Sequence, residues 1–220
     1  MGVPNIEISG KIVKDSAFAI GRSMVVSKRQ VSSEINLYPS GMDLEILKML
    51  SINEALMLNS LVRLFDSYRT KIDKLLIKLS NRGLVKNVSV ATEHTMFKLW
   101  LPMDTKVPRN AQEACRLAML GTFFSLAFKE IPNLQWRLIR NNKAPVLAEM
   151  TFIGKNGEEK WIIDVPRRGE KPQEKATLYI FPTIEEAVSL TPKGRRFTSD
   201  LFLLKNAGTP LNKRLLEHSN

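Results

Sequence analysis

The sequence predicts an α+β protein: a helical first domain that ends in a β-hairpin, then a small α+β domain with a mostly antiparallel sheet. Residues 67–86 combine an apolar helical stripe with a basic face, and residues 88–101 form two short apolar runs around a polar turn. After residue 133 the chain changes to short β-rich runs bounded by Gly, Pro and Asn. The expected division is an N-terminal arm or extension at 1–41, a first domain at 42–102, an α+β domain at 110–204 and a basic C-terminal tail at 205–220.

The N-terminal arm mixes short apolar pieces at 17–20 and 24–26 with scattered Lys and Arg, and 39–41 (Pro-Ser-Gly) marks its end. Two interpretations are equally supported. The arm follows a DNA groove or backbone, as basic N-terminal arms do, or it packs on the first domain with its charges in water.

Two helices are expected before the basic stretch. Residues 43–50 space Leu44, Leu47, Met49 and Leu50 as one amphipathic helix, and residues 52–64 supply a second, leucine-rich helix. Phe65 and Asp66 then form a turn.

The most informative segment is 67–86. Its apolar residues recur at i, i+3, i+4 and i+7, which predicts one buried helical stripe of Ile72, Leu75, Leu76 and Leu79. Ser67 is expected to cap the first turn, and Gly83 to end the helix in a left-handed conformation. The opposite stripe is polar and basic: Ser67, Thr70, Lys71, Lys74, Lys78 and Asn81.

Two helices, a turn, a third helix and a hairpin with its tip at 92–95 together resemble the winged helix-turn-helix superfamily over 42–102. The resemblance implies that the third helix enters a major groove of duplex DNA. Tyr68, Arg69 and Lys71 are then expected to contact base edges, and basic residues to contact phosphates: Lys74, Lys78, Arg82, Lys86 and Lys98. Ser67, Thr70 and His94 complete the expected DNA-binding set. The alternative is an ordinary three-helix bundle whose basic face is simply solvated.

Two prolines in 102–110 mark the boundary to the second domain, and Asn110 is expected to begin a long helix that ends near Ile131. A capping box, Thr183 with Glu186, predicts a short helix, and Asn156-Gly157 predicts a tight hairpin. Five strands are expected, at 134–139, 146–153, 161–165, 176–181 and 197–203.

Residues 146–149 (VLAE) and 161–169 (WIIDVPRRG), with this order of elements, resemble the replication-relaxation family of plasmid and conjugative-element proteins. The resemblance implies a reduced restriction-endonuclease core, in which Glu149 and Asp164 would be the acids that hold Mg²⁺. The lysine that such a nuclease needs two residues after the second acid is replaced by Pro166. An inactive core is therefore expected, with Asp164 paired to Arg167 or Arg168. No phosphate-binding loop, serine elbow or HExxH motif occurs in the sequence.

The amino-acid composition limits the classes of partner that the protein is expected to bind. A formal charge of +11 favours polyanions, nucleic acid first. The most apolar stretch, 117–128, is too short to cross a membrane and is expected to be a buried helix. No signal peptide is recognised, so a cytoplasmic location without a membrane partner is expected. One cysteine, Cys115, and two histidines in separate polar settings, His94 and His218, predict neither a disulfide nor a metal site. No cofactor is expected.

These observations predict a non-enzymatic, sequence-specific binder of double-stranded DNA. By family resemblance it would be an accessory factor in plasmid or mobile-element replication or conjugative transfer. The second domain would then support a homodimer or dock a protein partner. A transcriptional regulator with a partner- or ligand-sensing second domain is the first alternative, and a Mg²⁺-dependent nuclease is the second.

Overall fold

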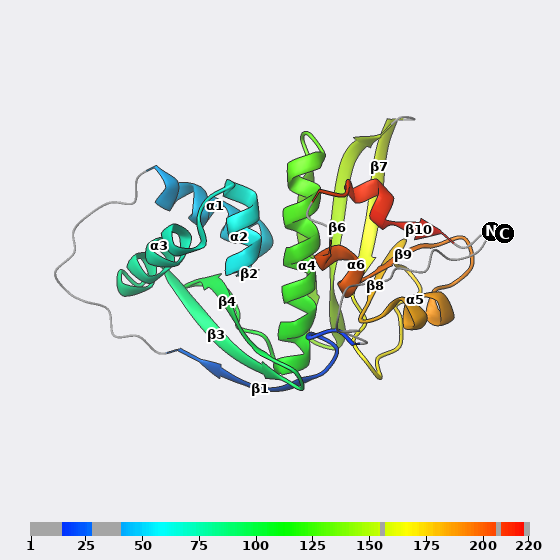
Figure 1. Cartoon of the computed structure of the whole chain (residues 1–220), viewed down its shortest axis with the longest axis horizontal. Helices are drawn as coiled ribbons and strands as arrows, with labels where there is room; N and C mark the ends of the chain where they lie inside the picture. Colours follow the sequence, from blue (N-terminus) through cyan, green and yellow to red (C-terminus); the bar gives the residue numbers. More distant parts are fainter. Residues whose placement is uncertain (1–14, 28–40, 155–156, 206–207, 218–220) are drawn as a thin grey trace.

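A long central helix, α4 (Ala111–Glu130), runs between two β-sheets in the computed structural model (Figure 1). The structure describes residues 15–27, 41–154, 157–205 and 208–217. Nearly every side chain of α4 from Ala111 to Ala127 is buried, which confirms the expectation of a buried helix at 117–128 except for its last residue, Phe128, which is exposed. The Asn110 side chain accepts a hydrogen bond from the Glu113 amide and fixes the start of the helix, as its sequence position predicts.

The first sheet has the strand order β1-β3-β4-β2, with every pair antiparallel. Its strands and the three helices beside it are β1 (Gly21–Val26), α1 (Met42–Asn53), β2 (Leu56–Met57), α2 (Leu58–Phe65), α3 (Arg69–Asn81), β3 (Val85–Thr92) and β4 (Met96–Pro102). The hairpin expected at 88–101 is confirmed, since β3 and β4 pair over seven positions from Val85↔Pro102 to Ala91↔Met96.

The second sheet is mixed and has the order β10-β9-β8-β7-β6-β5. The meander β5-β6-β7 is antiparallel, whereas β7-β8 and β8-β9 are parallel. Its elements after α4 are β5 (Gln135–Asn141), β6 (Ala144–Gly154), β7 (Gly157–Asp164), β8 (Leu178–Phe181), α5 (Ile184–Leu190), β9 (Arg196–Ser199), α6 (Asp200–Leu204), the 3-10 helix η1 (Leu211–Arg214) and β10 (Leu216–Glu217).

One large hydrophobic core joins the two halves, because α4 contributes to it from both sides. It includes Leu56 and Val88 of the first sheet, Phe123 of α4, and Met150 and Ile180 of the second sheet, all fully buried. A second, small cluster around Tyr179 and Phe181 lies under α5. The proline-containing stretch 102–110 thus connects two sheets that share one core.

The expectation of a single helix at 52–64 is wrong. Helix α1 continues to Asn53, and Glu54 then adopts a left-handed conformation (φ 60°) that ends it. The next residues form β2, in which Leu56 pairs with Trp100 and Met57 with Leu99. Pairing with β4 therefore overrides the helical pattern of this segment, and α2 begins only at Leu58.

The strand expected at 197–203 is only half correct. Strand β9 ends at Ser199, whose hydroxyl accepts a hydrogen bond from the Phe202 amide and starts α6. Here a serine cap outweighs an apolar run that is typical of a strand. The capping prediction for α5 is confirmed, since the Thr183 hydroxyl accepts from the Glu186 amide.

Part of the N-terminal arm is built into the fold. Strand β1 pairs with β3, and the Ser16 hydroxyl donates to the buried carboxylate of Asp200. A Cβ on Gly21 would lie 2.4 Å from the Ala111 backbone, so only glycine lets β1 approach α4 this closely. Residues 15–27 therefore pack on the rest of the protein, as the second interpretation of the N-terminal arm expects. Residues 1–14 and 28–40 lie outside the described residues.

The expected C-terminal tail also contributes structure. Leu211 is buried at the start of η1, and β10 pairs with β9. The described part of the tail is therefore packed on the fold through η1 and β10.

Candidate nucleic-acid interface

Helix α3 carries most of the predicted DNA-binding residues, and its position follows from its apolar stripe. Ile72, Leu76 and Leu79 are fully buried and Leu75 is partly buried, as the periodicity predicts. Gly83 adopts the expected left-handed conformation (φ 69°) after the helix. The prediction that Ser67 caps this helix is wrong, because Tyr68 occupies the N-cap position and no side chain caps the helix.

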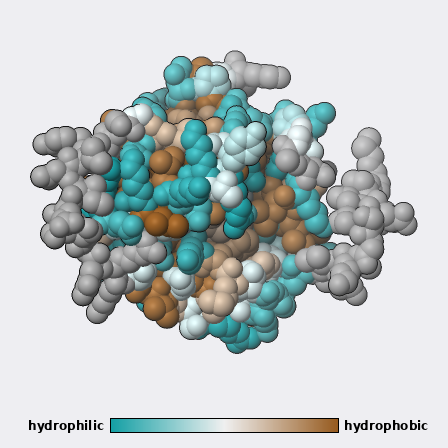
Figure 2. All heavy atoms as spheres, turned by 60° about the vertical axis from the view of Figure 1, so that its left-hand side comes forward, coloured by the Kyte–Doolittle hydropathy of each residue, from teal (hydrophilic) through white to brown (hydrophobic). Residues whose placement is uncertain are grey.

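The outward stripe of α3 is open to solvent. Tyr68 is 84% exposed, and Arg69, Thr70, Lys71 and Lys74 are exposed as well. Figure 2 turns this side of the molecule forward and shows hydrophilic residues over much of the face, with hydrophobic patches between them. Tyr68 therefore lies outside the core.

Lys71 and Lys74 have no ion pair with any residue that the structure describes. The same holds for Lys98 on β4, which is exposed. Arg69 donates from Nη1 to Oδ1 of Asn59 on α2, at 2.7 Å. These cations can approach a polyanion without breaking an ion pair that the structure describes.

Two of the expected phosphate contacts are held by an acid that the sequence did not identify. Lys78 Nζ lies 2.7 Å from Oδ2 of Asp43 on α1, and Arg82 Nη1 lies 3.6 Å from the same oxygen. The Asp43 and Arg82 side chains are only 3% and 6% exposed. Arg82 is therefore a buried structural cation, and Lys78, 45% exposed, is shared between Asp43 and solvent.

The remaining predicted residues lie farther along the chain. Ser67 is half-buried. Lys86 donates from Nζ to the Met103 carbonyl oxygen. His94, at the hairpin turn, lies 3.5 Å through Nε2 from the Asp15 carboxylate. This contact ties the turn to the N-terminal segment.

In the second half of the chain, Glu149 and Asp164 belong to separate ion-pair groups. Glu149 accepts hydrogen bonds from Arg137 and Lys160, which hold the pKa of its carboxyl below the usual range. Asp164 pairs with Arg116 of α4 at 2.8 Å, with both side chains buried. The expected pairing of Asp164 with Arg167 or Arg168 is wrong.

Those two arginines have other carboxylate partners. Arg167 pairs with Asp200, and Arg168 with Asp15 and Glu186. Among the described residues, no group of three or more His, Cys, Asp and Glu side chains is placed to hold a metal ion. Arginine guanidiniums do not readily accept a proton, so neither arginine can replace the lysine of a nuclease.

Cys115 is fully buried in α4, and desolvation raises the pKa of its thiol to about 12. Because only the thiolate reacts, we expect no labelling of the native protein by dithionitrobenzoate at mildly alkaline pH, and complete labelling of one thiol in urea. Rapid labelling without denaturant would show that this part of α4 opens, and would contradict its placement in the core.

No family model matches the chain, and comparisons with curated proteins and with solved structures give no match either. Within the described residues, no helix is both long and apolar enough to span a bilayer.

Proposed function

We propose that this protein binds double-stranded DNA through the outward stripe of α3, with α1, α2 and the β3-β4 hairpin acting as the other parts of a winged helix. The observation that carries the proposal is the contrast between the two faces of α3. One face is packed against the core through Ile72, Leu76 and Leu79, so the helix is fixed in place. The other offers Lys71 and Lys74, exposed and without an ion pair among the described residues.

In this proposal the cations have different roles. Tyr68, Arg69 and Lys71, at the start of α3, reach base edges. Lys74 and Lys98 contact phosphates, which position the protein without reading sequence. Lys78 contributes in part, and Arg82 is left out because it is buried. The net charge of +11 supports the proposal, since it raises the encounter rate with any polyanion.

The test compares a double variant with a matched control. Lys71→Ala/Lys74→Ala should bind a short random-sequence duplex more weakly, and should lower the slope of log K against log salt by about 0.9, because Lys74 is the phosphate contact that this variant removes. Fluorescence anisotropy over a salt series measures both quantities. Lys171→Ala/Lys175→Ala removes the same charge from exposed positions in the loop after β7 and should leave the slope nearly unchanged.

Equal slopes for the two double variants would refute the proposal, because binding would then depend on total charge and not on α3. Duplexes selected from a random pool would give the preferred site. A site within a replication or transfer origin would support the accessory role that the family resemblance suggests, and a promoter operator would support the regulator.

A further inference from the structure

A groove of about 660 Å³ lies between α2, the start of α3 and the β3-β4 hairpin, and α4 and α6 contribute to its lining through Thr122 and Leu204. Its size is within the range of pockets that bury small organic ligands. It lies where the helical half of the protein meets α4, next to the proposed DNA-binding helix.

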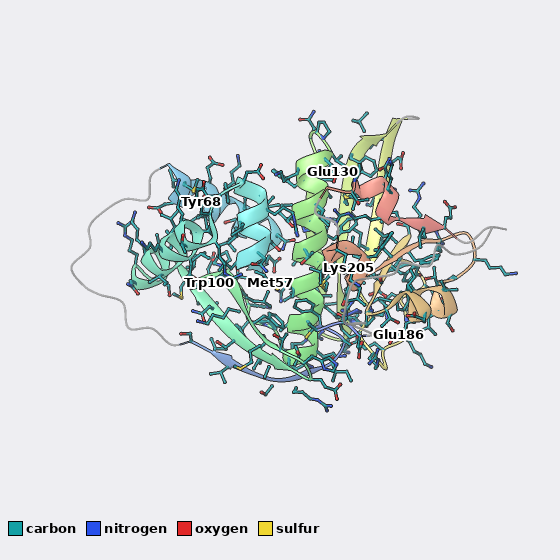
Figure 3. The ribbon with its side chains drawn as sticks, in the orientation of Figure 1. Met57, Tyr68, Trp100, Glu130, Glu186 and Lys205 are labelled. Carbon is teal, nitrogen blue, oxygen red and sulfur yellow. The ribbon has the colours of Figure 1, made fainter. Side chains whose placement is uncertain are left out.

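The lining includes apolar and aromatic side chains from β2 and β4. Met57 and Trp100 are nearly buried, and the partly buried Phe97 also belongs to β4. Figure 3 labels Met57 and Trp100. Met57 pairs with Leu99 across the two strands, so its side chain lies on the same face of the sheet as Leu99 and Phe97, whereas Trp100 projects from the other face. Phe18 packs edge-on against Phe97 with ring centroids 5.0 Å apart, which fixes that ring. Such a surface suits a flat apolar group.

Cations outnumber acids around this surface. Arg63, Arg69 and Lys98 line the groove, against Asp73 alone. Half-buried Arg63 donates from Nη1 to the Ser125 hydroxyl at 2.9 Å and has no ion pair with any carboxylate among the described residues. Burial, with the nearby charge of Arg214, lowers its pKa. A partly desolvated guanidinium without a counter-ion is a strong anion-binding group.

Ser60 gives an independent observation. It is 1% exposed, lines the same groove, and its hydroxyl has no hydrogen-bond partner. A buried hydroxyl without a partner loses its hydrogen bonds to water and gains none in return, so a partner from outside the protein is favoured. Ser60 and Arg63 are three residues apart on α2 and therefore lie on the same face of the helix. Both can donate to one acidic group.

We propose that this groove binds a small organic anion, with its acidic group on Arg63 and Ser60 and a flat apolar body against Met57 and Phe97. The groove also includes Arg69, which Asn59 holds at 2.7 Å. Occupation of the groove would therefore compete with DNA for Arg69. This coupling rests on the proposed function, whereas the anion site does not.

The experiment uses two dyes of similar shape and different charge: anilinonaphthalene sulfonate, an anion, and the neutral phenylnaphthylamine. The anion should bind with the higher affinity, and Arg63→Gln should weaken it about tenfold through loss of a charge-assisted hydrogen bond. The same variant should leave the neutral dye unchanged. Lys106→Gln removes an exposed charge outside the groove and serves as the matched control.

Ser60→Ala removes only a hydroxyl without a partner, so it should fold normally and weaken the anion about threefold. If Arg63→Gln does not fold, the affinity of Ser60→Ala for the anionic dye tests the anion site. Equal affinity for the two dyes, or unchanged affinity of the anion for both variants, would overturn the proposal.

A duplex titration with and without saturating anion tests the coupling. Weaker duplex binding in the presence of the anion supports competition for Arg69, and unchanged duplex binding overturns the coupling but not the site. Absence of duplex binding without any dye counts against the proposed function alone.

Discussion

Replacing Arg167 with alanine is expected to lower the free energy of unfolding by about 3–5 kcal/mol, the range for breaking a buried ion pair. Arg167 and Asp200 are both fully buried and joined by two hydrogen bonds, of 2.6 and 3.2 Å. The guanidinium also donates to the carbonyl oxygens of Phe18, Val165 and Ile180. It therefore joins the N-terminal segment to the loop after β7, to β8 and to the start of α6. Urea unfolding followed by tryptophan fluorescence measures the loss.

Two controls separate the buried pair from general effects of removing an arginine. Arg168→Ala breaks partly exposed ion pairs next in sequence, with Asp15 and Glu186, and should cost less than about 1 kcal/mol. Arg167→Met/Asp200→Leu replaces both buried charges by apolar groups and should recover most of the stability. A loss for Arg167→Ala no larger than that for Arg168→Ala would contradict the assigned role.

The free energy of unfolding of Arg167→Ala should depend on pH in a characteristic way. Burial raises the pKa of Asp200, and Arg167 opposes this shift. Without Arg167 the folded pKa rises further, so the folded state holds a proton that the unfolded state releases. The stabilisation that this proton on Asp200 gives to Arg167→Ala is fully present below the pKa of Asp200 in the unfolded state, about 4. It is lost as the pH rises toward the pKa of Asp200 in the folded state. The variant should therefore be more stable at pH 5 than at pH 8.

The elements predicted correctly have signals that can be read locally in the sequence. Helix α3 and the β3-β4 hairpin have a regular repeat of apolar residues, α4 is a long apolar segment, and α5 has a capping box; the bounds of these elements agree with expectation within a few residues. The wrong secondary-structure predictions at 52–57 and 200–204 have a different cause. Leu56 and Met57 are held as a strand by residues some 40 positions later, and Ser199 starts α6 through a local cap. Neither the strand pairing nor the cap alters the hydrophobic pattern from which the elements were predicted.

The candidate site was predictable only in part for the same reason. Helical periodicity indicates that Lys71 and Lys74 lie opposite Leu76, and they do. Nothing near Arg82 in sequence indicates that it is buried against Asp43, which belongs to another helix. The groove depends likewise on Arg63 and Trp100 from separate elements. Pairing across tertiary structure is not encoded in local spacing.

Asp43→Asn is expected to lower the free energy of unfolding by about 3 kcal/mol, because it leaves the buried guanidinium of Arg82 without a carboxylate. Glu45→Gln is the matched control: it removes an acid from the same first turn of α1, but Glu45 is exposed and should cost less than about 0.5 kcal/mol. Urea unfolding of the two variants compares them directly, and equal stabilities would show that Asp43 does not support Arg82.

Asp43→Asn also tests how far the proposed interface extends along α3. Asp43 neutralises Lys78, so its loss should free that ammonium for a phosphate and raise the salt slope of duplex binding by about 0.9. The effect should disappear in Asp43→Asn/Lys78→Ala. An unchanged slope in the single variant would place Lys78 outside the interface and limit the contacts of α3 with DNA to its first half. An increase would mean that Asp43 stabilises the fold and also limits the affinity for DNA, since one carboxylate holds a buried arginine and neutralises an exposed lysine.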